Sequence, residues 1–483
     1  MVLSIGLPSI RFKDRLYSSD ELAATAIGWL DFVRDRIPAG CESVAIALAN
    51  HPHALALFFT LSALPVPLIV LGVDPRSWRS SPPIPPATPL FLPPTLRHLV
   101  RDGEALGLPT YPLPDPTVSS SGQERARFLT MPGVVAFTSG STGPPKPVYI
   151  LTRSFLRQTA AAVQAYRLPA GCGIVGALPL SSHFGLGHAL FLPAVLGARL
   201  GLVERFDHRA VLALFTTGDY LYWAGTAAMA DLLARAPLAA SRPPSPSICH
   251  MSAGSVPESV FAAYSKRFGI PLRSSYGRTE NGFITAETAP PSEVRSDAVG
   301  QAAPGIEIRI GDDPRDPYPP GTIGRVWFSS PWYMEGYGFP GRLVPRDGRA
   351  GWWPTEDTGA LDGSGYLSLA GRIDDCFKTP SGYLVNPAEV AQALASHPSV
   401  GEIVVVPIRG AGQPVIGAMV EATLAPDPAE LRATAARLLP PWLHPEVLLV
   451  TNDLPRLSSG KVDRRACIAI LEEARTGAGP QAS

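Results

Sequence analysis

Apolar residues occur in short runs that alternate with segments of helical spacing over most of the sequence. Runs rich in branched apolar residues predict buried strands, for example Ser43–Ala49, Val66–Val73, Gly133–Phe137, Gly173–Leu178 and Arg199–Val203. Between them, segments such as Phe155–Tyr166 and Arg209–Thr216 place apolar residues three and four positions apart, as amphipathic helices do. This alternation predicts an α/β architecture of layered subdomains.

The pattern changes at about Val299, where short strand-like runs such as Ile306–Ile310 and Gly324–Phe328 are interrupted by glycine. They predict a small β-rich subdomain. The segment after Gly371-Arg372 predicts a compact α+β module. Its predicted helices are Pro387–Ser396 and Pro428–Leu439, and its predicted strands are Ile403–Pro407 and Ala418–Thr423. We therefore expect a large N-terminal domain over residues 1–371 and a small, mobile C-terminal domain over residues 372–483.

Two segments depart from the alternation. Residues 74–124 are rich in Pro and Ser and predict irregular surface chain, with a helix at Thr95–Leu106 left open. Residues 54–73 run uncharged for about twenty positions, the length needed to cross a bilayer. Because Pro65 and Pro67 interrupt this run, we expect a buried helix through Leu64, a turn and a buried strand instead.

Composition narrows the classes of function. The 483 residues are 46% hydrophobic and 17% charged, which suits two or three domains with sizeable cores. The 41 basic and 41 acidic side chains cancel, so we expect neither nucleic acid nor a membrane as a partner. The 5 cysteines show no CxxC spacing, and the N-terminus lacks the features of a signal peptide. Reduced thiols and a cytoplasmic location are therefore expected.

The candidate chemistry begins directly after the strand predicted at Gly133–Phe137. The sequence there is Thr138-Ser139-Gly140-Ser141-Thr142-Gly143-Pro144-Pro145-Lys146. The glycines let backbone N–H groups approach an anion closely, the hydroxyls add hydrogen-bond donors, and Lys146 adds a positive charge. The segment predicts a phosphate-binding loop. It is not a Walker loop, because the GxxxxGK[ST] pattern is absent.

This loop resembles the phosphate loop of the AMP-binding superfamily, which contains acyl- and aryl-CoA synthetases, luciferases and peptide-synthetase adenylation domains. Further similar motifs follow in the family's order: Ser275–Glu280 (SYGRTE), Thr355–Gly359 (TEDTG), Gly371–Asp375 (GRIDD) and Leu454–Lys461 (LPRLSSGK). The chain is identified as a stand-alone member. The resemblance implies a ligase that activates a carboxylic acid with ATP and releases pyrophosphate. The acyl group then passes to a thiol, either of CoA or of the phosphopantetheine of a separate carrier protein.

The same resemblance implies roles for individual residues. ATP is held by Thr138, Ser139, Gly140, Ser141, Thr142, Gly143, Lys146, Gly254, Ser275, Tyr276, Gly277, Thr279, Asp357 and Arg372. Among these, Tyr276 packs against adenine and Asp357 binds the ribose. Glu280 holds Mg²⁺, a hard cation that prefers oxygen ligands. The catalytic set is Lys461, Thr142 and Glu280, with Lys461 bridging the attacking carboxylate and the α-phosphate.

Two features depart from the family pattern, namely the residue at position 356 and the length of the loop at Lys378–Gly382. Glu356 stands where relatives usually have glycine, which adds bulk and charge next to Asp357. Asp374 matches the hinge about which the C-terminal domain rotates between the two half-reactions. The loop that carries Gly382 into the thiol channel is one residue longer than usual, at Lys378–Gly382.

The acid pocket is expected from the resemblance to include His183, Gly185, Trp223, Ser252 and Ser274. Trp223 and the Ser252–Pro257 stretch, which is similar to benzoate-type ligases, favour an aromatic or otherwise compact acid. His183 lies one position later than the equivalent residue of relatives, so a core histidine remains the alternative. His183 and His188 alone do not supply a metal site beyond Mg²⁺.

Two alternatives remain open. The lengthened Lys378–Gly382 loop is compatible with adenylation followed by transfer to an amine or another non-thiol acceptor. Glu356 and the displaced His183 are compatible with a nucleotide-binding protein without turnover. The presence of Lys146, Glu280, Asp357 and Lys461 together favours catalysis.

Overall fold

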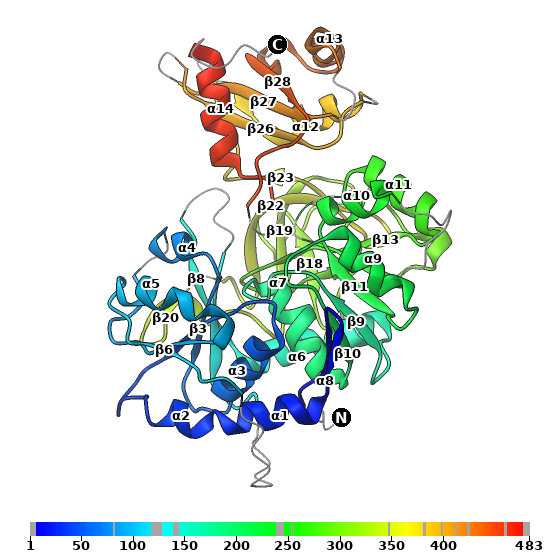
Figure 1. The fold of residues 1–483 in the computed structure, drawn as a ribbon. Coiled ribbons are helices and arrows are strands. Elements are labelled where there is room, and N and C mark those ends of the chain that lie inside the picture. The colour runs from blue at the N-terminus through cyan, green and yellow to red at the C-terminus, as the bar shows by residue number, and fades with distance from the viewer. Residues whose placement is uncertain are drawn as a thin grey trace.

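The structure of the protein is a computed structural model. It describes residues 6–80, 83–116, 128–138, 144–237, 246–252, 254, 256–345, 348–379, 383–397, 399–410, 413–422, 426–457 and 461–476. The first two thirds of the chain form two large sheets, and the C-terminal module lies on top of them (Figure 1).

The first sheet has eight strands in the order β21-β20-β8-β7-β4-β3-β5-β6. Five neighbouring strands, β7, β4, β3, β5 and β6, run parallel to one another. Strands β8, β20 and β21 are each antiparallel to their neighbours. The bounds are Val44–Ala47 (β3), Leu68–Leu71 (β4), Leu90–Leu92 (β5), Thr110–Pro112 (β6), Gly133–Phe137 (β7), Pro147–Leu151 (β8), Gly336–Phe339 (β20) and Arg342–Val344 (β21).

The second sheet has seven strands in the order β13-β12-β11-β9-β10-β1-β2, parallel except for the pairing of β1 with β2. The bounds are Ser9–Phe12 (β1), Arg15–Tyr17 (β2), Gly173–Gly176 (β9), Arg199–Leu202 (β10), Tyr222–Gly225 (β11), Ile248–Met251 (β12) and Leu272–Ser274 (β13). Its strands are short, and β9 and β11 in its centre are fully buried because both faces are covered there.

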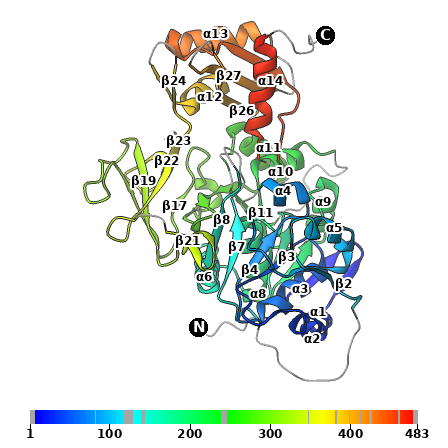
Figure 2. The same ribbon diagram turned by 90° about the vertical axis from the view of Figure 1, so that its left-hand side faces the viewer.

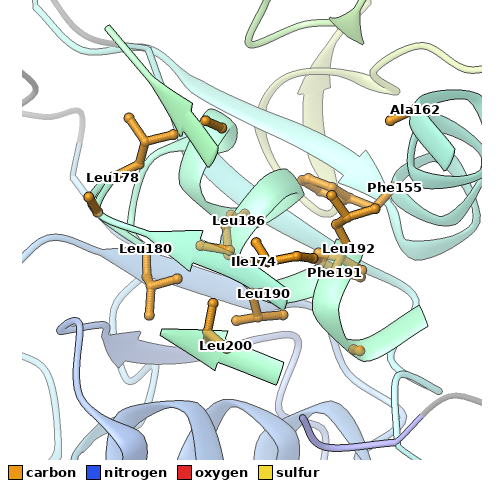
Figure 3. Packing of buried hydrophobic residues seen from close by; sticks show 14 of the residues in the cluster. Phe155, Ala162, Ile174, Leu178, Leu180, Leu186, Leu190, Phe191, Leu192 and Leu200 are labelled. Carbon is orange, nitrogen blue, oxygen red and sulfur yellow. The ribbon is translucent and has the colours of Figure 1, made fainter. Parts of the chain in front are cut away.

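One large apolar core joins the two sheets through the helices that pack on them, with α3 (Pro52–Ser62), α6 (Thr152–Tyr166) and α8 (Leu192–Leu196) contributing. Phe155 of α6 stacks on Phe191 with ring centroids 4.6 Å apart. Figure 3 shows these rings next to leucines from β10 and from the loop after β9. This packing forms a rigid wall behind the cavity described below.

Most of the further helices cover the outer faces, as Figures 1 and 2 show, whereas α7 (His183–Leu186) is mostly buried. Their bounds are Ser19–Gly28 (α1), Leu30–Arg34 (α2), Pro75–Ser80 (α4), Val100–Glu104 (α5), His183–Leu186 (α7), His208–Thr216 (α9), Ala227–Arg235 (α10) and Glu258–Phe268 (α11). Several begin at a polar cap: Ser18 accepts from the Glu21 N–H group, and Thr226 accepts from that of Met229.

A four-stranded antiparallel sheet follows, in the order β18-β19-β22-β23. The strands are Glu307–Ile310 (β18), Gly324–Ser329 (β19), Trp353–Leu361 (β22) and Leu367–Arg372 (β23). The C-terminal module is a separate three-stranded sheet with helices on it, composed of Pro387–Ala395 (α12), Ile403–Ile408 (β26), Val415–Glu421 (β27), Pro428–Leu438 (α13), Val447–Thr451 (β28) and Arg464–Thr476 (α14). Figure 2 shows it above the point where β23 ends.

The sequence-based expectations hold for the fold class, for the strands and helices named above, and for the buried helix–turn–strand at residues 52–71. Within the described part of the chain, no helix combines the length and the apolar character needed to span a membrane. The prediction of irregular chain over residues 74–124 was wrong in part. Strands β5 and β6 extend the first sheet there. The helix left open at Thr95–Leu106 is present, as a 3₁₀ turn at Pro94–Leu99 that leads into α5. Because these strands have three residues each, they carry too little periodicity to be recognised.

Candidate active site

A cavity opens where the parallel strands of the second sheet end. Residues just past β9, β11, β12 and β13 line it, together with one face of α6, and its volume is about 180 Å³. Ligand sites of open α/β sheets lie at this carboxyl edge, because the chain changes direction there and leaves a crevice. Lys461, from the C-terminal module, also lines the cavity.

Arg278 joins two carboxylates at the edge of this cavity. Its guanidinium lies 2.9 Å from Asp357 Oδ2 and 3.5 Å from Glu280 Oε1. The phenol of Tyr276 also donates to Asp357. Burial alone lowers the pKa of Arg278, but Glu280, Tyr276 and Asp357 outweigh it and raise the pKa well above the usual range. Arg278 therefore stays charged and fixes both carboxylates.

Asp357 is held from the strand side as well. Its N–H group donates to Thr355 Oγ1 at 3.1 Å, and Arg372 Nη1 lies 3.5 Å from its Oδ1. Side chains alternate along β22: Thr355 and Asp357 are buried, whereas Glu356 between them is only partly buried and points to the opposite face. The glutamate therefore does not take space beside Asp357, although the sequence placed it next to the nucleotide.

Tyr337 connects Glu280 to Lys146, at the end of the predicted phosphate-binding loop. Its hydroxyl donates to Glu280 Oε1 at 2.6 Å, and Lys146 Nζ lies 5.6 Å from the centre of its ring. The ends of the loop are tied together, because the Lys146 N–H group donates to Thr138 Oγ1 at 2.9 Å. The predicted residues Ser139, Gly140, Ser141, Thr142 and Gly143 lie outside the described residues. Tyr337 was missed in the sequence, since it comes from β20, far along the chain.

Lys461 reaches the cavity from the C-terminal module, where hydrogen bonds and ion pairs hold the neighbouring described residues. Its carbonyl accepts from the Leu457 N–H group at 2.8 Å, and Arg456 forms ion pairs with Glu421 and Glu402 at 2.7 and 2.8 Å. Burial lowers the pKa of Lys461, as do the cations Arg372 and Arg278, while Glu280 and Asp357 oppose the shift. The lysine is thus a partly desolvated cation on the cavity wall.

The segment after β23 carries the predicted hinge. Arg372 binds Asp374 through two hydrogen bonds of 2.8 and 2.7 Å, and Asp374 itself is exposed. Gly382, predicted for the thiol channel, lies outside the described residues.

The residues predicted for the acid pocket separate into two groups. His183 and Ser252 line the cavity, as do Ser275, Tyr276, Gly277 and Thr279 of the nucleotide motif. His183 stacks on Phe155 at 4.8 Å, and its Nε2 lies 3.1 Å from Gln158 Oε1. It is therefore both a buried histidine and a lining residue.

The structure corrects other pocket predictions. Trp223 is fully buried on the opposite face of β11, against Phe215 and Tyr264, and does not line the cavity. Ser274 is buried and is not a lining residue either. Gly254, which was predicted for ATP and not for the acid pocket, is exposed and does not line this cavity. Gly185 acts indirectly: a Cβ atom there would lie 2.0 Å from the Pro179 carbonyl oxygen, so glycine allows the backbone to fold tightly at the cavity wall.

A hydrogen-bonded chain of side chains was not predicted. Tyr222 Oη lies 2.7 Å from His188 Nδ1 and 2.5 Å from His250 Nδ1, and His250 Nε2 bonds to Ser275 Oγ. Burial, with a smaller effect of His183, lowers the pKa of His188 to about 3. Burial also takes the pKa of His250 well below and that of Tyr222 well above their usual ranges. All three are therefore neutral.

Comparison with known proteins identifies the family. Residues 115–338 match the family model described as AMP-binding enzyme, and residues 389–461 match AMP-binding enzyme C-terminal domain. The chain belongs to the AMP-binding, adenylate-forming family. The fold class inferred from the family resemblance is thereby confirmed.

Individual members of the family differ in what they are named for. Indoleacetate–CoA ligase of Aromatoleum aromaticum is 27% identical over 95% of this chain and 94% of its own length. Sulfoacetate–CoA ligase of Cupriavidus necator is 26% identical over 69% of this chain and 66% of its own. In six further curated relatives the match spans only 50% to 65% of their own length.

Among solved structures, amide bond synthetase McbA of Marinactinospora thermotolerans superposes with a TM-score of 0.79 at 25% identity, covering 96% of this chain and 97% of that one. The ATP-bound MatB of Rhodopseudomonas palustris gives a TM-score of 0.81 at 20% identity, covering 98% and 97%. The latter likeness shows the fold alone.

Proposed function

We propose that the protein uses ATP to activate a carboxylic acid as an acyl-adenylate and then transfers the acyl group to a thiol. One observation carries the proposal: Lys461 of the C-terminal module lines the same cavity as Tyr276 and Ser275, beside the carboxylates Asp357 and Glu280. The first half-reaction brings two anions together, so it depends on positioning and on a cation at the reacting atoms.

The geometry supports a division of work around the nucleotide. Tyr276 provides a flat face for the adenine, and Asp357, fixed by Arg278 and Arg372, provides acceptors for the two ribose hydroxyls. Thr138 and Lys146 close the loop that would hold the terminal phosphates. Lys461 would neutralise the carboxylate as it attacks the α-phosphate. An unbranched ammonium adapts to this changing charge better than a rigid guanidinium.

Mg²⁺ is the expected metal, and Glu280 fits it. The carboxylate lies at the cavity edge and is oriented by Tyr337 and Arg278, and hard cations prefer such oxygen ligands together with phosphate. Bound there, Mg²⁺ would offset the charge of the leaving pyrophosphate. No cluster of three or more His, Cys, Asp or Glu side chains suited to a metal ion occurs among the residues that the structure describes.

For the acid we propose a compact aromatic compound. Phe184 and Phe283 line the cavity, and Ala162 and Leu192 complete an apolar wall. The relative that matches almost the whole chain is named for indoleacetate, an aromatic acid. CoA is the proposed thiol, because several relatives are named CoA ligases. A carrier-protein thiol is the remaining option within this proposal.

The decisive experiment replaces the lysine. We expect Lys461→Ala to lower acid-dependent ATP–pyrophosphate exchange at least about a hundredfold, in the range typical of the removal of a charge-stabilising group. Lys266→Ala, which removes an exposed lysine on α11, serves as the matched control and should keep wild-type exchange. Full exchange by Lys461→Ala would contradict the role proposed for this lysine.

A second function has its own support. McbA, named an amide bond synthetase, is 25% identical to this chain over nearly its whole length, so an amine as final acceptor is the alternative. Incubation of enzyme, ATP and acid with CoA or with an amine distinguishes the two. Thioester formation supports the leading proposal, whereas amide formation without thioester supports the alternative.

A further inference from the structure

The hydrogen-bonded chain Ser275–His250–Tyr222–His188 forms one side of the proposed acid pocket. Its members come from β11, β12, the segment after β13, and the short π-helical turn Gly187–Phe191 that carries His188. Three of the four line the cavity, and Tyr222 lies behind them, fully buried. The nucleotide chemistry proposed above uses none of the histidines.

The direction of the protons along this chain follows from counting hydrogen bonds. Ser275 Oγ can donate to the Met251 carbonyl, 3.2 Å away, if His250 donates to Ser275. A neutral His250 then has a bare Nδ1, which accepts from the Tyr222 hydroxyl. With its only proton used, Tyr222 accepts from His188 Nδ1–H. With the opposite proton direction, the hydrogen bond to the Met251 carbonyl is not made. The direction described first therefore has one more hydrogen bond.

This proton direction determines which nitrogen of His188, at the end of the hydrogen-bonded series, carries the proton. Neutral His188, with its proton on Nδ1, presents an unprotonated Nε2. None of the described residues donates a hydrogen bond to His188 Nε2. The unpartnered polar atoms that are fully buried do not include it, so the atom is accessible. Because His188 lines the cavity, its Nε2 is a hydrogen-bond acceptor open to a ligand.

The charges of the cavity restrict the ligand further. Among the described lining residues, Arg278 and Lys461 are the charged ones. Arg278 is already paired with Asp357 and Glu280, so Lys461 remains for the reacting carboxylate. A second anionic group on the acid would have no cation to meet it, and its burial would be unfavourable.

On the basis of the function proposed above, we infer that the acid is a ring-bearing monocarboxylate whose O–H or N–H group donates to His188 Nε2. Aromatic side chains surround that acceptor, with the ring of Phe184 5.0 Å and that of Phe283 6.5 Å from the His188 ring. His188 is thus a specificity-determining residue, and Tyr222 is a positioning residue that fixes its tautomer.

The test compares pairs of acids that differ only in the donor. Indole-2- and indole-3-carboxylate are paired with the corresponding benzofuran carboxylates, and the three aminobenzoates with the three methylbenzoates. We expect the best acid to carry a donor and to exceed its partner at least about tenfold in kcat/KM for pyrophosphate exchange, because an unmet buried acceptor penalises the analogue. Ratios under tenfold in every pair overturn the inference while leaving acid activation intact. Absence of exchange with every acid removes the proposed function itself.

Two variants assign the discrimination to this chain of residues. His188→Phe removes the acceptor, and Tyr222→Phe removes the group that holds the His188 proton on Nδ1; both should reduce the ratio within the best pair to below about threefold. His98→Phe makes the same replacement at an exposed position and should retain the wild-type ratio. Thermal unfolding identifies any variant that is not folded. A folded His188→Phe enzyme with the wild-type ratio contradicts the inference.

Discussion

The ion pairing and the pKa of a charged side chain in the cavity depend on its neighbours and not only on its residue type. Arg278 and Lys461 are both cations on one wall, yet two carboxylates hold the first, whereas no described residue forms an ion pair with the second. The fixed arginine orients Asp357 and Glu280. The unpaired lysine keeps its charge for the substrates, and burial makes that charge easier to lose.

This difference predicts how adenylation depends on pH. Because the folded protein lowers the pKa of Lys461, the ammonium is fully present below that lowered value and is lost as the pH rises through it. The kcat/KM for pyrophosphate exchange should therefore fall on the alkaline side with an apparent pKa below the value of about 10.4 typical of an exposed lysine. Lys461→Arg should lower the rate and abolish this alkaline limb, since arginine does not titrate there. An unchanged limb in that variant would assign it to another group.

The sequence predicted the residues of the proposed chemistry better than the residues that line the acid pocket. Contiguous motifs contain Tyr276, Glu280, Asp357 and Lys461, and the structure brings all four to one cavity edge. The acid pocket is assembled from separate elements, and whether Tyr222 or Trp223 of β11 faces it depends on strand register. A run that is buried on both faces contains no polar alternation from which to choose a face.

At the scale of secondary structure, the hairpin of β14 (Gly277–Arg278) and β15 (Gly282–Phe283) positions the acid pocket. Gly282 has φ of +70°, and a Cβ atom there would lie 2.0 Å from Gln158 Oε1 and 2.5 Å from His183 Nε2. Gln158 Nε2 and His183 Nδ1 are buried without a hydrogen-bond partner among the described residues. The pair is therefore held mainly by its own bond and by the close approach of Gly282.

Gly282→Ala should displace this pair. Gly218 is the matched control, because it also has φ of +70° but a Cβ atom there would meet no other atom within 4 Å. Gly218→Ala should lower the free energy of unfolding by about 1 kcal/mol through backbone strain alone. Gly282→Ala should lower it by about 1–3 kcal/mol more, from steric overlap, and should raise the KM for the acid more than that for ATP. Urea unfolding and steady-state kinetics measure both; equal losses in the two variants would show that the pair is not displaced.

At the scale of the whole molecule, the active site belongs to two parts of the chain. The two large sheets supply the cavity, whereas Lys461 comes from the three-stranded module that follows β23 (Figure 1). Under the proposed function, this arrangement corresponds to the first half-reaction, for which we propose that the lysine is needed. Transfer to a thiol requires the module to withdraw Lys461, and we propose that the chain turns at Asp374 to do so.

Fixing that turn should separate the two half-reactions. Proline restricts φ to about −65°, so Asp374→Pro should hinder rotation and slow thioester formation at least about tenfold more than pyrophosphate exchange. Asp374→Ala is the control, because it removes both hydrogen bonds to Arg372 but leaves the backbone free to turn. The two rates are measured on the same preparations, with the acid that supports the fastest exchange. If Asp374→Ala and Asp374→Pro slow thioester formation equally, the Arg372–Asp374 pair matters and the rotation lies elsewhere. If only the proline variant does so, Asp374 is the point about which the module delivers and removes its lysine.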